Sequence, residues 1–188
     1  MFLIVGLGNP GLEYENTRHN IGFRCIEQLA EKYGAVWHHK SKYNALITPT
    51  TIIEGVNVVM CKPQTYMNLS GNAVQSVAAF YKIKPENIIV LHDEIDLPVA
   101  KIMYKFSGGN AGHNGLKSIT QNLGNNFHRI RIGVGRPQHP EHQVSDYVLE
   151  KIPPTELQSL QTKIKLITDN IDLLLHNKMD QIKKIYQS

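Results

Sequence analysis

Apolar residues along the chain recur with two spacings, one typical of strands and the other of helices. Short apolar runs bounded by glycine, proline or charged residues indicate strands that are buried on at least one face. We expect strands within the segments 2–8, 43–53, 56–62, 87–91, 100–106 and 128–135. Glu54 and Gly55 stand between the second and third segments, which predicts a hairpin there.

Other segments repeat apolar residues at steps of three and four, the spacing of an amphipathic helix. This pattern predicts helices over 21–33, 66–81 and 112–124. It is longest near the C-terminus, where it comprises Leu157, Leu160, Ile164, Ile167, Ile171, Leu174, Ile182 and Ile185. Strands interleaved with helices predict an α/β fold with a mixed twisted sheet flanked by helices and a long C-terminal amphipathic helix. Because no repeat or linker interrupts the pattern, we expect residues 1–188 to form a single domain.

The composition indicates a globular protein rather than a membrane-spanning or secreted one. Of the 188 residues, 41% are hydrophobic, which is ordinary for a globular domain. No apolar stretch approaches the ~18 residues of a membrane span, and residues 1–8 lack the basic region of a signal peptide. Cys25 and Cys61 fall in apolar-periodic segments, so we expect reduced core thiols rather than a disulfide or metal ligands. These features predict a cytoplasmic protein that does not contact a membrane.

The net charge of +4 is unevenly distributed along the chain. Residues 101–140 contain no Asp or Glu, but they contain six basic residues: Lys101, Lys105, Lys117, Arg129, Arg131 and Arg136. A segment of this kind can focus a positive field on one face, which suits phosphate-rich ligands. A solvated basic surface without a partner is the alternative.

The glycines of residues 6–11 match the G-x-G-x-x-G pattern of dinucleotide-binding proteins. In those proteins a helix begins within the motif, and its N–H groups bind the pyrophosphate. Here Pro10 follows Asn9, and helical periodicity begins only near Ile21. We therefore interpret the motif as a strand-end turn that directs Asn9 into a cleft, and we expect no nucleotide cofactor.

Polar side chains gather where the predicted strands end. Ligand sites of α/β sheets form outside the C-terminal ends of strands, so these side chains are candidates for one common site. Four segments supply them: Asn9, Tyr14 and His19 after the first strand, Tyr66, Met67 and Asn68 after 56–62, Asp93 after 87–91, and His113 and Asn114 at a helix start.

Among these residues, His19 and Asp93 have catalytic potential. A neutral imidazole can take a proton from water, while a carboxylate on its other nitrogen fixes the tautomer and stabilises the imidazolium. No G-x-S-x-G motif is present and both cysteines are expected to be buried, which favours direct attack by water. The alternative is that His19 is a helix-start residue bonded to local backbone and Asp93 a turn former. The histidines do not match known zinc spacings, so we expect no metal.

Taken together, the segments closely resemble one family, bacterial peptidyl-tRNA hydrolase. The resemblance rests on VGLGNPG-EY-TRHN-GF near the start, KPQTYMNLSG, HDEIDLP, GHNGLKSI and FHRIRIGVGRP, in the family's order and spacing over about residues 1–150. It implies a monomeric α/β enzyme without metal or other cofactor. Such an enzyme hydrolyses the ester between a peptide and the 3′ ribose of tRNA, and so recycles peptidyl-tRNA released by ribosomes.

The resemblance also implies roles for individual residues. His19 would be the general base and Asp93 would orient it, while Asn9 would sense the blocked amino end of the peptide. The remaining contacts to substrate would come from Tyr14, Tyr66, Met67, Asn68, His113 and Asn114, with Lys105 and Arg131 on tRNA phosphates. The chain departs from the family's glycine-rich loop at Ser107, Asn110 and Ala111. It also has Val99, Ala100 and Met103 after DLP, where the family commonly has a glycine and another basic residue.

Overall fold

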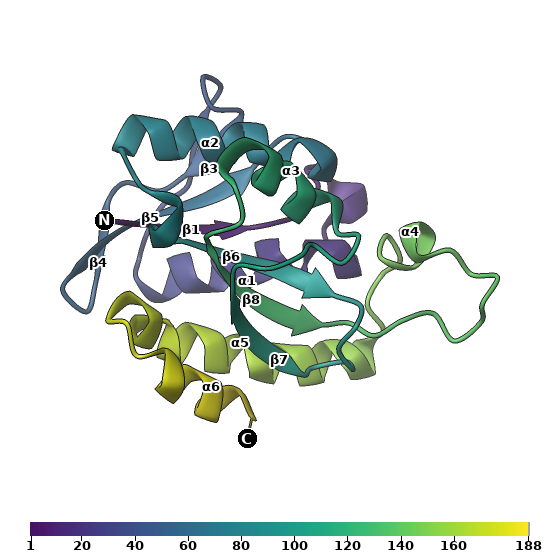
Figure 1. Ribbon diagram of the computed structural model, residues 1–188. Coiled ribbons are helices and arrows are strands. Elements are labelled where there is room, and N and C mark those ends of the chain that lie inside the picture. Colours follow the sequence, from purple (N-terminus) through teal and green to yellow (C-terminus); the bar gives the residue numbers. More distant parts are fainter. Residues whose placement is uncertain (188) are drawn as a thin grey trace.

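The computed structural model describes residues 1–187 and contains one eight-stranded sheet (Figure 1). Across the sheet the order is β2-β3-β5-β1-β6-β8-β7, and β4 pairs with the first half of β5. The neighbours among β5, β1, β6 and β8 are parallel, whereas the outer pairs are antiparallel. The strands are β1 Phe2–Gly6, β2 His38–Lys40, β3 Ala45–Ile47, β4 Thr51–Ile53, β5 Val56–Pro63, β6 Ile88–Glu94, β7 Ile102–Phe106 and β8 His128–Gly133.

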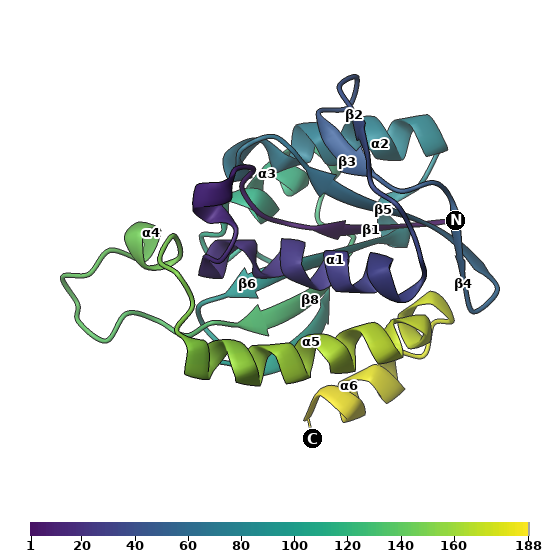
Figure 2. The same cartoon turned by 180° about the vertical axis from the view of Figure 1, so that it is seen from behind.

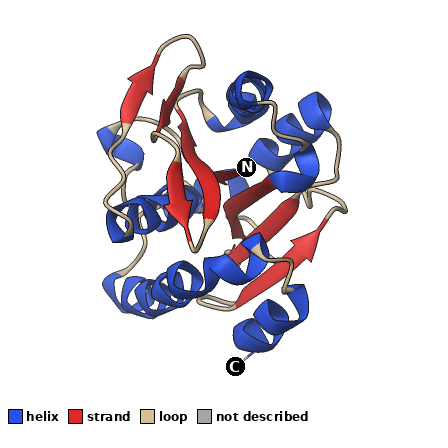
Figure 3. Cartoon of the chain, turned by 90° about the vertical axis from the view of Figure 1, so that its left-hand side faces the viewer, coloured by secondary structure: helices blue, strands red, loops and turns tan. Residues whose placement is uncertain are grey.

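Helices cover both faces of this sheet (Figures 2 and 3). On one face lie α2 and α3, and on the other lie α1 and α5, while α6 packs beside the edge strand β7. The helices are α1 Ile21–Lys32, α2 Ser70–Tyr81, α3 Asn114–Leu123, α4 Val144–Tyr147, α5 Pro154–Leu175 and α6 Met179–Gln187. Single 3-10 turns are η1 Leu12–Tyr14, η2 Arg18–Asn20, η3 Met67–Leu69 and η4 Pro85–Asn87.

The central strands are apolar along their whole length because both of their faces are covered. In β1, Leu3 and Val5 pack in the cluster beneath α2 and α3, whereas Ile4 packs in the cluster beneath α1 and α5. The edge strand β7 instead alternates, with Ile102 buried and Met103 exposed. The predicted α/β fold with a mixed sheet flanked by helices is therefore confirmed, as is the burial of both cysteines as free thiols.

Several predicted elements differ in their limits. The segment 43–53 forms two short strands rather than one, because Pro49 has no N–H for the ladder and interrupts it. The helix expected over 66–81 begins only at Ser70, after the turn η3. The long C-terminal helix is confirmed as α5, but it ends at Leu175, and a second helix, α6, carries the last apolar positions.

Two elements were missing from the prediction. The strand β2 consists of three exposed residues, and α4 spans only four, so neither has an apolar pattern that could reveal it. Among residues 1–187, no helix is long and apolar enough to cross a membrane.

The glycines near the start of the chain allow β1 and α1 to approach each other closely. A Cβ atom on Gly6 would lie 2.4 Å from the carbonyl oxygen of Gly22, and one on Gly22 would lie 2.3 Å from that of Leu91. Between β1 and α1 the chain makes only the turns η1 and η2. The glycines thus serve strand–helix packing, and the interpretation that they form no phosphate-binding helix start agrees with this arrangement.

We expect Gly22→Ala to lower the free energy of unfolding by about 1–3 kcal/mol or more, because the new methyl group meets rigid backbone. Gly109→Ala is the matched control, since a Cβ there has no neighbour within 4 Å. Urea denaturation of both variants measures the difference. Equal stability of the two variants would contradict the proposed close packing.

Candidate functional site

The candidate site lies at the switch point of the sheet, where the order of the parallel strands reverses. β1 is flanked by β5 on one side and β6 on the other, so the connections from these strands diverge at their C-terminal ends. Ligands bind at such switch points in α/β proteins. Asn9 follows β1 here, and Asp93 is near the end of β6.

His19 reaches this edge from the turn η2, which is tied to the segment after α4. The backbone N–H of His19 donates to the carbonyl of Val148 at 2.8 Å. The neighbouring Arg18 is buried, and its Nη1 donates to the carbonyl of Tyr147 and to Oε2 of Glu150, both at 3.0 Å. Residues 147–151 therefore position the turn that carries His19.

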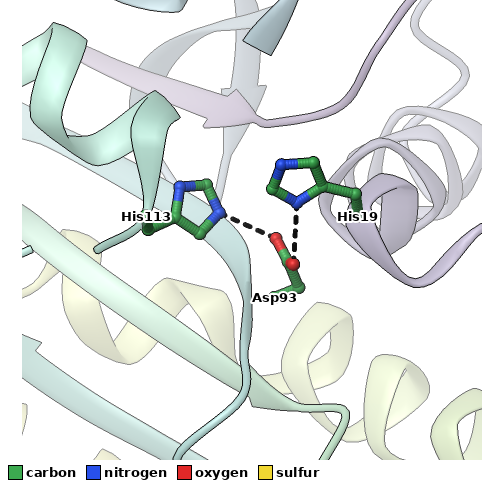
Figure 4. A group of neighbouring side chains, drawn as sticks. All are labelled: His19, Asp93 and His113. Atoms are coloured by element: carbon green, nitrogen blue, oxygen red, sulfur yellow. Dashed lines mark hydrogen bonds and ion pairs between the residues drawn. The ribbon is translucent and has the colours of Figure 1, made fainter. Parts of the chain in front are cut away.

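The carboxylate of Asp93 joins two imidazoles (Figure 4). Nδ1–H of His19 donates to Oδ2 at 2.8 Å, and Nε2–H of His113 donates to Oδ1 at 2.8 Å. Asp93 is buried, with 2% of its surface exposed. Each carboxylate oxygen thus accepts a hydrogen bond from a different ring, one carried by η2 and the other by the residue before α3.

The helix start determines the tautomer of His113. Its Nδ1 accepts hydrogen bonds from the backbone N–H groups of Gly115 at 3.1 Å and Leu116 at 3.3 Å. Nδ1 must therefore be unprotonated, which places the proton on Nε2, facing Asp93. His113 acts both as the N-cap of α3 and as a fixed neutral donor to Asp93.

The charge of Asp93 perturbs its histidine partner. Burial by itself lowers the pKa of His19, but attraction to Asp93 and the hydrogen bond between them outweigh burial and leave that pKa raised above 6.5. For Asp93, burial raises the pKa, whereas attraction to His19 and the hydrogen bonds from His113 and His19 hold it well below its usual range. The carboxylate is therefore ionised at neutral pH.

Asn9 is held by a reciprocal backbone contact. Its N–H donates to Oδ1 of Asn20, and Nδ2 of Asn20 donates back to the Asn9 carbonyl, both at 2.9 Å. Oδ1 of Asn9 accepts from the backbone N–H of Met67 at 2.8 Å. Within residues 1–187 these bonds leave the Nδ2 donor of Asn9 without a protein acceptor.

Two adjoining clefts meet at His19. One, of about 270 Å³, is lined by Asn9, His19, Tyr66, Met67, Asn68, Asn114, Ser145, Val148 and Leu149. The other, of about 250 Å³, includes His19, Asp93, His113 and Asn114 in its wall. Tyr14 lies beside them, with its ring centroid 6.3 Å from that of Tyr66. The side chains expected to act together therefore do lie together.

Lys105 and Arg131 do not line these clefts, although Glu94, the partner of Arg131, lines the second one. Both line a small cavity of about 30 Å³ beneath the loop before α3. Nε of Arg131 is paired with Oε1 of Glu94 at 3.0 Å, and Arg136 is paired with Asp96. The acidic residues just before the basic segment thus neutralise part of its charge.

The loop over residues 107–112 is held by a buried cation. Arg129 is 1% exposed, and its guanidinium donates to the carbonyls of Gly108 at 3.0 Å and Gly109 at 2.6 Å. Ser107 and Ala111 both adopt left-handed backbone, with φ of 63° and 48°. That conformation costs a non-glycine residue about 1–2 kcal/mol. Arg129 is therefore a structural residue, unavailable to a ligand.

The donor set at Asp93 does not fit a metal ion. The side chains of His19, Asp93 and His113 offer ligand atoms within 4.8 Å of one another. A cation bound to Nε2 of His113 would require the proton to move to Nδ1, where two backbone N–H groups already donate. Coordination would therefore sacrifice the cap of α3.

Several residues of the site were missed by sequence reasoning. Asn20 holds Asn9, while Ser145 and Val148 line the clefts. His19 is positioned by Arg18 and Tyr147. Asn20 is adjacent to His19 in the TRHN segment, so its position offered a signal. The segment 144–151 offered none, because it reaches the site only through the fold.

Fold and site together define an α/β protein with a candidate active site at the switch point of its sheet. A model of the peptidyl-tRNA hydrolase family matches residues 3–188. Peptidyl-tRNA hydrolase of Rickettsia bellii (strain RML369-C) is 51% identical over 97% of this chain and 98% of its own, and that of Rickettsia canadensis (strain McKiel) is 49% identical over the same shares.

Crystal structures show the same similarity. That of peptidyl-tRNA hydrolase from Acinetobacter baumannii has a TM-score of 0.94 and 42% identity, covering 99% of this chain and 94% of that one. The chain belongs to the peptidyl-tRNA hydrolase family, and it is an enzyme that acts on the ester bond of peptidyl-tRNA.

We expect Asp93→Asn to lower the pKa of His19, because burial of the ring remains while attraction to the carboxylate is lost. Titration of the imidazole resonances by NMR measures this shift without substrate. Asp96→Asn is the matched control, since Asp96 pairs with Arg136 instead. An unchanged His19 pKa in Asp93→Asn would show that the pair does not interact in solution.

Proposed function

We propose that His19 is the general base of the hydrolysis and that Asp93 orients it. The hydrogen bond that carries this proposal is the one from Nδ1–H of His19 to Asp93, because it leaves Nε2 as the unprotonated ring nitrogen. In the proposed step Nε2 takes a proton from water as the water oxygen attacks the ester carbonyl. The imidazolium then gives the proton to the departing 3′ oxygen of the ribose.

His113 supports the same proposal as a positioning residue. Because its tautomer is fixed by the cap of α3, it can only donate to Asp93. The donated bond holds the carboxylate in place and leaves the other oxygen for His19. This assignment differs from the expected role of His113 as a substrate contact.

Asparagine side chains of the cleft supply donors and acceptors for the substrate. Nδ2 of Asn9 is directed by the Met67 bond and is proposed to bind a carbonyl of the peptide near its blocked amino end. Asn68 and Asn114 are exposed beside His19 and are proposed to hold the water and polarise the ester carbonyl. Tyr14 and Tyr66 are proposed to flank the 3′ end of the tRNA.

Binding of tRNA is proposed to use phosphate contacts away from the clefts. An enzyme that accepts many peptides gains little from side-chain recognition, so affinity must come from the tRNA backbone. Lys105 is half-buried beside Arg131 and has no ion pair within residues 1–187. For Arg131 to bind a tRNA phosphate, its ion pair with Glu94 must break. We further propose that the enzyme acts as a cytoplasmic monomer that recycles tRNA from prematurely released peptidyl-tRNA.

We expect His19→Ala to lower kcat by about 10²–10⁴-fold while tRNA affinity is unchanged, since affinity rests on the phosphate contacts. Release of peptide from N-blocked aminoacyl-tRNA measures the rate. In the wild type, kcat/KM should rise with pH through the raised pKa of His19, because only the neutral ring accepts a proton. His176→Ala, at the far end of α5, is the control. Full activity of His19→Ala would refute the proposed base.

We expect Lys105→Ala to weaken tRNA binding and to reduce the slope of log affinity against log salt concentration by about 0.7–0.9, the value for one phosphate contact. Lys178→Ala provides the comparison, because this exposed lysine follows the far end of α5. Binding isotherms at several salt concentrations give both quantities. An unaltered slope in Lys105→Ala would remove this residue from the interface.

A further inference from the structure

A second basic segment of the chain lies outside the proposed tRNA contacts. Residues 35–85 contain Lys40, Lys42, Lys62, Lys82 and Lys84, with Glu54 as the single acidic residue. Glu54 lies in the turn between β4 and β5, where its carbonyl accepts from His176 beyond α5. Residues 35–85 therefore place no carboxylate in the β2–β3 loop or at the end of α2.

The β2–β3 loop and the end of α2 enclose a cleft of about 330 Å³, which we call the Tyr43–Phe80 cleft. It is lined by His39, Lys40, Ser41, Lys42, Tyr43, Ile47, Phe80 and Tyr81. Figures 1 and 2 both show this loop rising beside α2. Two separate parts of the chain form the cleft, and within residues 1–187 neither contributes an acidic side chain to its lining.

Aromatic rings form the wall of this cleft. The centroids of Tyr43 and Phe80 are 5.6 Å apart, and those of Phe80 and Tyr81 are 4.9 Å apart at 85°. Phe80 is 57% exposed, and it stands beside two other aromatic rings rather than alone on the surface. Much of the Phe80 side chain is thus accessible from solvent at the end of α2.

Two lysines line the cleft beside these rings. The Nζ atom of Lys42 is 5.8 Å from the ring centroids of both Tyr43 and Phe80. Lys40 and Lys42 are exposed, and within residues 1–187 neither forms an ion pair. An exposed aromatic face beside unpaired lysines is the combination that binds a base by stacking and its phosphate by charge.

We propose that the Tyr43–Phe80 cleft binds an unpaired nucleotide of RNA, stacked on Phe80 with its phosphate at Lys42. The cleft is separate from the candidate active site. α2 begins next to Met67 and Asn68 and carries Phe80 near its other end, about 15 Å away at a rise of 1.5 Å per residue. The proposal concerns binding alone, so it stands whether or not His19 is the catalytic base.

The test uses single-stranded hexauridylate and hexaadenylate carrying a fluorescent label, titrated with the full chain. We expect Phe80→Ala to weaken binding about fivefold or more, which corresponds to the loss of one stacked base. Phe80→Tyr should restore binding because it retains the ring. Lys42→Ala should weaken binding and reduce its salt dependence. Phe106→Ala, which removes an exposed ring from the edge strand β7, is the matched control and should bind normally.

Because the Phe80 ring is exposed, its truncation should leave the fold intact, which thermal unfolding of each variant verifies. Equal binding by wild type and Phe80→Ala would overturn the proposal. The proposal would also be overturned if an RNA duplex or polyglutamate bound as tightly as the single strand, with affinity that Lys42→Ala lowers and Phe80→Ala does not. The surface would then recognise any polyanion, including an acidic protein.

Kinetics with peptidyl-tRNA identify the source of the nucleotide. If it belongs to the substrate, Phe80→Ala raises KM and leaves kcat unchanged. If it belongs to another RNA, KM is unchanged although hexanucleotide binding is weakened. Both results support the cleft as a nucleotide site, and neither depends on the chemistry at His19.

Discussion

The candidate active site depends on one buried carboxylate that accepts hydrogen bonds from two histidines. Asp93 lies at the end of the fully buried strand β6, where an unpaired charge would be costly. His19 and His113 each donate to one of its oxygens. Removal of either donor would leave a buried carboxylate oxygen with one hydrogen bond fewer. The Asp93 carboxylate therefore fixes the turn η2 and the start of α3 relative to each other.

Each donor is held by a different part of the fold. η2 is anchored to residues 147–151, through Arg18 and the backbone of His19. His113 is fixed by the first N–H groups of α3 and by the loop that Arg129 fastens to the sheet. Neither arrangement involves substrate. The geometry proposed for water activation is therefore preorganised, as electrostatic catalysis requires.

Basic residues that look alike in the sequence serve different purposes in the structure. Arg129 binds backbone carbonyls, Arg131 is paired with Glu94, and Lys105 has no carboxylate partner within residues 1–187. A count of charges along 101–140 therefore overstates the positive field. The lysines near Phe80 are fewer, but among residues 1–187 no acidic side chain lines the Tyr43–Phe80 cleft, so their charge is available to a ligand.

The sequence alone determined the alternation of apolar strands and helices, and hence the α/β fold, because these periods are local. It also showed that Asn9, His19, Asp93 and Asn114 follow strands or begin helices. The limits of the elements were less predictable. Pro49 separates β3 from β4 where one strand was expected, and α2 begins only after the turn η3. Only the tertiary structure decided that Asp93 meets residues 74 and 20 positions away, and that His113 donates a hydrogen bond to Asp93. Such contacts depend on how β6, η2 and α3 pack, and packing is a property of the whole chain.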